Sequence, residues 1–215
     1  MVTMLDDHSR YIIFLTETPP HTQSGALKHV LRNRDYCTHY HPENAPSPPD
    51  PLPEARIPAQ LTHARGGSWL AYKKHTSWSP MIRPLTLPED CPRATTCAVK
   101  LTLLSGTKAA FIACYLPQPL EEHAQVCKAL ANLPQVLPHQ ILILGGDLQG
   151  DWEGPSPKTP HITSLPFERW KGPTTPTFQP HQQPNQASFI DHLTIWDPDH
   201  ITQQIGVTQP SIQRS

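Results

Sequence analysis

The sequence predicts an α+β fold in which two β-sheets pack face to face with helices outside them. Two apolar runs, 95–104 and 108–117, are separated only by "SGT", which is typical of a β-hairpin. Segments 24–34 and 119–133 place apolar residues at helical spacing between other runs of strand length. Strands paired by a short hairpin, with helices inserted between others, together indicate this fold class.

The other strands are expected where short apolar or alternating runs occur. The helix expected at 119–133 opens with two glutamates, and negative charge in a first turn favours the positive end of a helix. The glycine pair at the start of 66–74 marks the entry to a strand. The remaining predicted strands are 10–18, 36–41, 66–74, 140–147 and 187–196.

Length and charge limit the function. The 215 residues are predicted to form one domain, 1–215, long enough to bury a sizeable core. No apolar run approaches the ~20 residues that span a bilayer, so no membrane partner is expected. With 17 basic and 18 acidic residues, the chain lacks a broad positive field for nucleic acid, and phosphate binding must be local. The start "MVTMLDDHSR" has no secretory layout, so we predict an intracellular protein, with a nuclear location compatible with the sequence.

The cysteines and histidines favour packing over metal chemistry. Five cysteines without a CxxC pair indicate reduced thiols that serve mostly as packing residues. His39 and His41 would share one face of a strand, and without a third ligand at suitable spacing a surface strand is favoured over a metal site.

The 27 prolines gather in three segments, 41–60, 154–166 and 172–184. Proline removes a backbone donor and disfavours helix in the residue before it, so all three segments are expected to be loops.

Three predicted strands end in carboxylates. The runs "IIFLTE", "ILILGGD" and "SFID" deliver Glu17, Asp147 and Asp191. Such strand ends can converge at a sheet rim, where carboxylate oxygens suit a hard cation such as Mg²⁺. Gly145 and Gly146 carry no side chains beside Asp147, so a backbone or a ligand can approach closely. The sequence therefore predicts a metal-assisted site for a phosphodiester.

These runs resemble motifs of the endonuclease/exonuclease/phosphatase superfamily, in its retrotransposon (non-LTR) endonuclease branch. Five matching motifs occur in the family's order and cover nearly the whole chain: "IIFLTETP", "RGGSWLAYK", "FIACYLP", "ILILGGDLQGDW" and "SFIDHLTIW". The resemblance implies a four-layer α/β/β/α sandwich of the DNase-I-like kind. It also implies phosphodiester hydrolysis with Mg²⁺ or Mn²⁺, and DNA as the substrate.

Roles follow from matched positions in these motifs. Glu17 would hold the metal, and Asp147 would orient or activate the attacking water. Tyr115 would stand against the scissile phosphate, and Asp191 would support the catalytic histidine. Gln149 occupies the position where the family has asparagine; its amide can also donate to a phosphate oxygen, but it is one methylene longer, so weaker catalysis is expected.

Thr177 or Ser188 could touch phosphate, although their proline-rich loop aligns poorly.

The two ends of the chain also depart from the family. The family's opening strand with an asparagine and its closing strand with an Asp-His pair have no counterpart, so the domain is expected to be incomplete, lacking its first and last strands. His192 neighbours Asp191 on a strand and so points to the opposite face. His200 could replace the missing histidine only through a tight reversal near Pro198.

Three functional interpretations remain open on the sequence alone. The first is an endonuclease domain of a retrotransposon-type reverse-transcriptase polyprotein, impaired by these departures. The second is a catalytically dead fragment of such an element. The third, weaker one is a proline-rich interaction protein, because "PSPPDPLP" within 41–60 can adopt the extended polyproline conformation that binds aromatic grooves.

Overall fold

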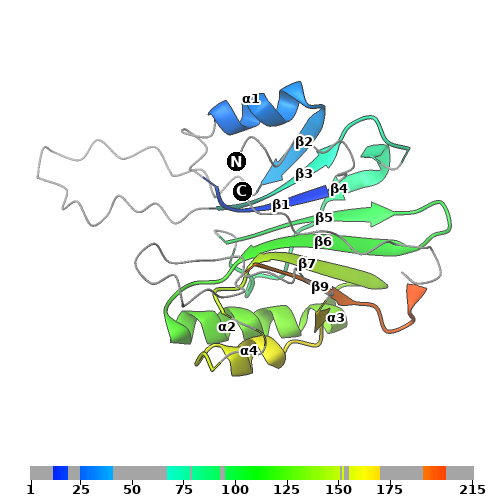
Figure 1. The fold of residues 1–215 in the computed structure, drawn as a ribbon. Coiled ribbons are helices and arrows are strands. Elements are labelled where there is room, and N and C mark those ends of the chain that lie inside the picture. The colour runs from blue at the N-terminus through cyan, green and yellow to red at the C-terminus, as the bar shows by residue number, and fades with distance from the viewer. Residues whose placement is uncertain are drawn as a thin grey trace, which may run out of the picture.

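The computed structural model describes residues 12–18, 25–40, 67–77, 79–92, 95–150, 152, 155–169 and 191–201. The described elements form two β-sheets packed face to face, with helices on both outer faces (Figure 1). The predicted two-sheet sandwich with outer helices is therefore confirmed. The expectation that the family's opening and closing strands are missing is not tested by the described residues and stays a prediction.

The smaller sheet has three antiparallel strands in the order β1–β3–β2. The helix α1 lies across its outer face, where Leu27 and Leu31 pack against Ile13, Leu15 and Ala71. The strand and helix boundaries are β1 Ile12–Thr18, α1 Gly25–Asn33, β2 Tyr36–Tyr40 and β3 Gly67–Lys73.

The larger sheet has six strands in the order β4–β5–β6–β7–β9–β8. Among the described strand pairs of this sheet, only β6 and β7 run parallel. The chain between them crosses over through α2 and α3 on the outer face. The strands are β4 Ile82–Pro84, β5 Thr96–Thr102, β6 Lys108–Tyr115, β7 Ile141–Asp147, β8 Glu168–Arg169 and β9 Asp191–Trp196. The helical segments are η4 Ser79–Met81, α2 Leu120–Ala131, α3 Leu133–Val136 and α4 Thr159–Thr163.

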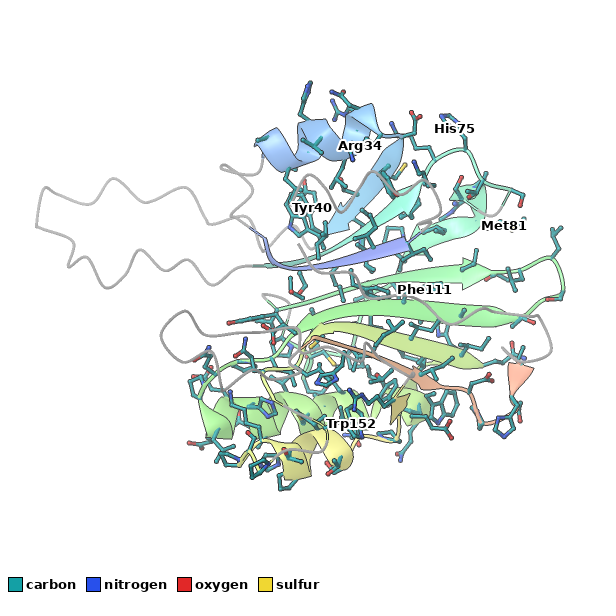
Figure 2. All side chains as sticks on the ribbon, in the orientation of Figure 1. Arg34, Tyr40, His75, Met81, Phe111 and Trp152 are labelled. Atoms are coloured by element: carbon teal, nitrogen blue, oxygen red, sulfur yellow. The ribbon has the colours of Figure 1, made fainter. Side chains whose placement is uncertain are left out.

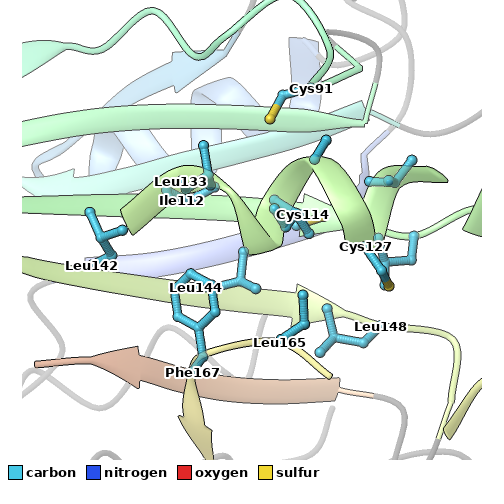
Figure 3. Packing of buried hydrophobic residues seen from close by; sticks show 14 of the residues in the cluster. Cys91, Ile112, Cys114, Cys127, Leu133, Leu142, Leu144, Leu148, Leu165 and Phe167 are labelled. Atoms are coloured by element: carbon cyan, nitrogen blue, oxygen red, sulfur yellow. The ribbon is translucent and has the colours of Figure 1, made fainter. Parts of the chain in front are cut away.

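Alternation along the strands separates two apolar layers. On β6, Ala110, Ile112 and Cys114 face the helices, whereas Phe111 and Ala113 face the smaller sheet. The largest buried cluster lies between the larger sheet and helices α2 to α4 (Figure 3). This pattern follows from the two-residue period of a strand that is buried on both faces.

Replacing Leu144 by alanine is expected to lower the free energy of unfolding by about 3–5 kcal/mol, because its side chain is fully buried and a cavity would remain. Leu104 is 92% exposed, so Leu104→Ala serves as a matched control that should change stability by less than ~0.5 kcal/mol. Urea unfolding measures both. Equal effects of the two substitutions would contradict the assigned core.

Four of the five cysteines confirm the predicted packing role. All five are free; Cys91, Cys97, Cys114 and Cys127 are buried, and three of these have a pKa raised by burial to about 12. Buried neutral thiols behave as small apolar groups, which fits their place in the core.

One loop prediction is wrong in part. The segment 154–166 contains the short helix α4, and Pro160 lies in its first turn, where a missing backbone N–H costs nothing. The strand β4 was also not predicted; it ends in Pro84, which is tolerated because β4 lies at the edge of its sheet. The proline-rich segments 41–60 and 172–184 lie outside the described residues. Across the described ranges, no helix is both long and apolar enough to cross a bilayer.

Candidate active site at the strand rim

Three of the predicted site residues lie in one row across adjacent strands. Asp147 ends β7; its register partners are Tyr115 on the parallel strand β6 and Asp191 on the antiparallel strand β9. Neighbouring strands lie about 4.8 Å apart, so Asp147 stands between the other two backbones at one rim of the larger sheet. Two of the three acids predicted to converge, Asp147 and Asp191, are therefore backbone neighbours, although Asp191 begins β9 rather than ending a strand.

The glycine pair brings β1 of the smaller sheet onto this rim. A Cβ atom at position 145 would lie 2.7 Å from the ring of Phe14, and one at position 146 would lie 2.8 Å from Thr16. Successive contacts therefore advance along β1 and β7 in the same direction. They place the end of β1, with Glu17, at the level of Asp147.

A β-bulge shapes the end of β1. Leu15 pairs with Trp69 and Thr18 pairs with Gly67, so Thr16 and Glu17 together oppose the single residue Ser68. Bulges bend a strand and re-aim its residues, and they are common beside active sites. The predicted metal ligand thus lies on an irregular stretch of backbone opposite Asp147.

The carboxylate of Asp147 is 4% exposed and is bound by Gln149. The backbone N–H of Gln149 donates to Oδ1 at 2.8 Å, and its side-chain amide donates to Oδ2 at 2.6 Å. Gln118 donates in turn to Oε1 of Gln149 at 3.0 Å. Gln149 adopts a left-handed backbone with φ 53°, a conformation that favours asparagine more than glutamine.

The negative charge of Asp147 affects the pKa of two nearby groups, Lys158 and Cys114. Burial lowers the pKa of the Lys158 ammonium, and the negative charge of Asp147 opposes that shift. Burial also raises the pKa of the Cys114 thiol, with neighbouring thiols and Asp147 adding to it. A cationic side chain near the rim could meet an anionic substrate or balance Asp147.

Two buried histidines hold the loop that follows Asp147. The Nε2–H of His123 donates to the Leu148 carbonyl at 3.0 Å, and that of His192 donates to the Gly150 carbonyl at 2.8 Å. His192 also packs near Trp152, with ring centroids 5.8 Å apart. His192 thus supports the loop from the helical side of the sheet, whereas its orientation relative to Asp191 stays a prediction, because the structure does not describe the side chain of Asp191.

His123 gives this loop a pH dependence with a definite sign. Burial lowers the pKa of His123 below its ordinary 6.5, so the unfolded chain binds more protons between the two values. The stabilisation is fully present above pH 6.5 and is lost as the pH falls through the folded-state pKa. We expect His123→Gln to unfold with a weaker pH dependence than the parent between about pH 7.5 and about pH 5 in urea titrations. Equal pH dependence of the two proteins would contradict this role.

His200 lies away from the rim. A turn does follow β9, in which the N–H of His200 donates to the Asp197 carbonyl at 3.1 Å. However, β9 runs from Asp191 beside Asp147 to Trp196 beside Leu142, so this turn stands at the opposite end of the strand. A return of His200 to the site through this turn is excluded.

The donor groups at the rim fit a hard divalent cation. Asp147 offers carboxylate oxygens, which Mg²⁺ and Mn²⁺ prefer to nitrogen or sulfur, and the backbones of two further acids, Glu17 and Asp191, lie at the same rim. Among the described residues, no three His, Cys, Asp or Glu side chains cluster as a ready ligand set. A cation held by one or two of these carboxylates, with phosphate and water completing its coordination, agrees with both observations.

The sequence did not indicate Gln118 or Lys158. Gln118 lies three residues beyond Tyr115 at the same rim, a position that strand-end reasoning could have covered. Lys158 precedes α4 and approaches Asp147 only through the fold, so no local pattern marks it. Of the other predicted phosphate contacts, Thr177 and Ser188 lie outside the described residues.

No family model matches the chain, and no curated protein matches it by sequence. Its fold is similar to that of several solved structures. The endonuclease/exonuclease/phosphatase from Bacteroides vulgatus has a TM-score of 0.58 at 12% identity, over 92% of this chain and 77% of that one. D. rerio TDP2 complexed with a single-strand DNA product has a TM-score of 0.57 at 10% identity, over 92% and 75%. An endonuclease/exonuclease/phosphatase family protein from Leptotrichia buccalis has a TM-score of 0.56 at 13% identity, over 90% of this chain and 78% of that one.

These similarities show that the chain has the DNase-I-like fold of the endonuclease/exonuclease/phosphatase superfamily. At such low identity they concern the fold alone. The rim of Tyr115, Asp147 and Asp191 lies on this fold where β6, β7 and β9 meet β1.

Proposed function

We propose that the chain is a Mg²⁺- or Mn²⁺-dependent phosphodiesterase that cleaves DNA, of the retrotransposon-endonuclease type. The observation that carries this proposal is the row of Tyr115, Asp147 and Asp191, with the bulged end of β1 packed beside it. D. rerio TDP2, which shares the fold, was captured with a single-strand DNA product, and this supports a nucleic-acid substrate.

The resemblance of the motifs implies a role for each residue at the rim, and we adopt these roles in the proposal. Asp147 accepts a hydrogen bond from the attacking water and orients it, and the buried surroundings strengthen that interaction. The hydroxyl of Tyr115 donates to a non-bridging phosphate oxygen. Glu17 would hold a metal ion, which would supply positive charge to neutralise the phosphodiester and the leaving oxygen. Asp191 supports the group that transfers a proton.

Hydrolysis of a small diester tests this class of activity without any nucleic-acid recognition. We expect bis(p-nitrophenyl) phosphate to be hydrolysed in Mg²⁺ or Mn²⁺ and not in EDTA, and the monoester p-nitrophenyl phosphate to be hydrolysed far more slowly. Release of p-nitrophenolate measures both reactions. Hydrolysis that is indifferent to EDTA, or faster on the monoester, would contradict a metal-dependent diesterase.

A second candidate, an inactive relic of the enzyme, is favoured by the contacts of Gln149. Its amide is directed back to Asp147 and is held there by Gln118, so the donor expected to meet phosphate is occupied. In this interpretation the longer side chain has closed the site that asparagine would leave open.

The substitution Gln149→Asn tests whether the side chain of Gln149 closes the site, as the second candidate holds. The shorter amide suits the left-handed backbone and releases Oδ2 of Asp147, so we expect diester hydrolysis to increase by about 10-fold or more. Gln140→Asn, in the loop before β7, is a matched control with no expected effect on the rate. A rate unchanged by Gln149→Asn would show that the contact of Gln149 with Asp147 does not limit the reaction.

A further inference from the structure

A basic groove lies at the edge of the smaller sheet, away from the Asp147 carboxylate. It encloses about 520 Å³, which is within the ~300–1,000 Å³ typical of ligand sites. Its described lining comes from α1, β2 and the end of β3, and contains three cations, three tyrosines and no acid. These residues are Lys28, Arg32, Lys74, Tyr36, Tyr40 and Tyr72, with Cys37 and Thr38.

The charge around this groove differs from that of the whole chain. Residues 25–40 and 67–75 contain five basic residues and one acidic residue, whereas the whole chain has 17 and 18. The single acid, Asp35, already lies 3.9 Å from Nε2 of His75. This region therefore carries a local positive charge on a protein whose net charge is -1. A chain without a broad positive field can bind phosphate only at such a local concentration of basic residues.

Tyr40, at one end of the groove, is held in place by the cation of Lys28 and by the ring of Trp69. Tyr40, which is labelled in Figure 2, stacks on Trp69 with ring centroids 5.0 Å apart. The ammonium of Lys28 lies 4.7 Å from the Tyr40 ring. Lys28 also donates to the hydroxyl of Tyr40 at 3.4 Å. This end of the groove presents an ordered ammonium and a phenol together, and both can donate to a phosphate oxygen.

The register of the smaller sheet links the groove to the candidate active site. Tyr40 pairs with Trp69, and Trp69 pairs with Leu15, two residues before Glu17 on β1. The Lys28–Tyr40 end of the groove is therefore at the same end of the sandwich as the rim. From there the groove runs along β2 toward Arg32 and Lys74.

We propose that this groove is a second binding site, which holds the sugar–phosphate backbone of a single-stranded nucleic acid. The choice of nucleic acid rests on the proposed function, and the groove adds its own reasons. Three cations without a lining acid complement a chain of phosphates. A groove that combines cations with aromatic side chains is how proteins hold single strands, whereas duplex interfaces are larger.

Fluorescence anisotropy of a labelled oligothymidylate of roughly 12 nucleotides tests the site directly. The measurement uses the full chain carrying Asp147→Asn in EDTA, so it requires no catalysis. The test variant is Arg32→Ala with Lys74→Ala. The matched control is Lys100→Ala with Lys128→Ala, which removes the same charge from exposed positions on the larger sheet and α2.

The groove variant is expected to bind the oligonucleotide about 10-fold more weakly than the parent. Its plot of log binding constant against log salt concentration is expected to have a slope shallower by about 1.4, which is ~0.7 for each lost phosphate contact. The control should keep both the parent affinity and the parent slope. Arg32→Gln alone, at an exposed position, should lose affinity about 3-fold and guards against misfolding of the double variant. Equal losses in both double variants, or no binding by the parent in about 50 mM salt, would overturn the proposal. If the parent binds the oligonucleotide but does not hydrolyse the diester, the proposed phosphodiesterase function is contradicted and the proposal of a binding groove still stands.

Discussion

Asp147→Asn is expected to reduce metal-dependent phosphodiester hydrolysis by about 10²–10³-fold, because a neutral amide cannot hold and orient the attacking water as the carboxylate does. Asparagine keeps the size of the side chain and the Oδ1 atom that accepts the Gln149 backbone N–H. It places an NH₂ group against the amide of Gln149, so one hydrogen bond is lost, at a cost of about 1–3 kcal/mol. The fold should therefore survive while the activity does not.

Asp35→Asn is the matched control for this substitution. The side chain of Asp35 is 65% exposed and lies beside His75, on the smaller sheet. Both variants lose one negative charge, so a shared change in rate would reflect net charge. An Asp147→Asn protein that retains the parent rate, and melts as the parent does, would contradict the proposed role of the rim.

Gly146→Ala is expected to lower the free energy of unfolding by at least about 3 kcal/mol. The backbone of Gly146 has φ 141°, which L side chains rarely adopt, and a Cβ atom there would lie 2.1 Å from the backbone carbonyl oxygen of Cys114. Backbone of a neighbouring strand cannot rotate away as a side chain can. The substitution must therefore displace β6 or the end of β7, and with it the position of Asp147.

Two other glycines separate the sources of this cost. Gly106 also has a positive φ, 87°, but nothing lies within 4 Å, so Gly106→Ala should cost only about 1–2 kcal/mol of backbone strain. Gly25 opens α1 in free space and without a positive φ, so Gly25→Ala should be neutral or slightly stabilising. Thermal melting of the three variants should rank them in this order. A Gly146→Ala protein as stable as Gly106→Ala would show that the close approach of β6 is not required.

Much of the fold could be predicted because its signals are local. The hairpin of β5 and β6 follows from two apolar runs around "SGT", and the α2 helix from apolar residues at helical spacing. Short or exceptional elements were harder. The helix α4 contains a proline that reads as a loop signal, and β4 has only three residues. Such elements are stabilised by the strands and core beside them rather than by their own sequence.

The candidate site divides in the same way. That Tyr115 and Asp147 end strands could be predicted from the apolar runs before them, but their side-by-side position depends on the parallel pairing of β6 and β7, which no local pattern indicated. The bulge before Thr18 could not be predicted, because it depends on strand register. The hydrogen bonds of Gln149 to Asp147 could not be predicted either, because they depend on a left-handed backbone that no local pattern specifies. The sequence indicated which residue types gather at the rim, and the fold determined which of them touch.

The most direct test of the central claim is nicking of supercoiled plasmid by the parent protein and by Asp147→Asn, each in Mg²⁺ and in EDTA. The proposal of a metal-dependent phosphodiesterase at the strand rim predicts nicked circles only for the parent protein in Mg²⁺. Nicking by the variant, or nicking in EDTA, would contradict it. So would the absence of nicking by a parent protein that melts cooperatively, which would leave the rim as the remnant of a site that no longer acts.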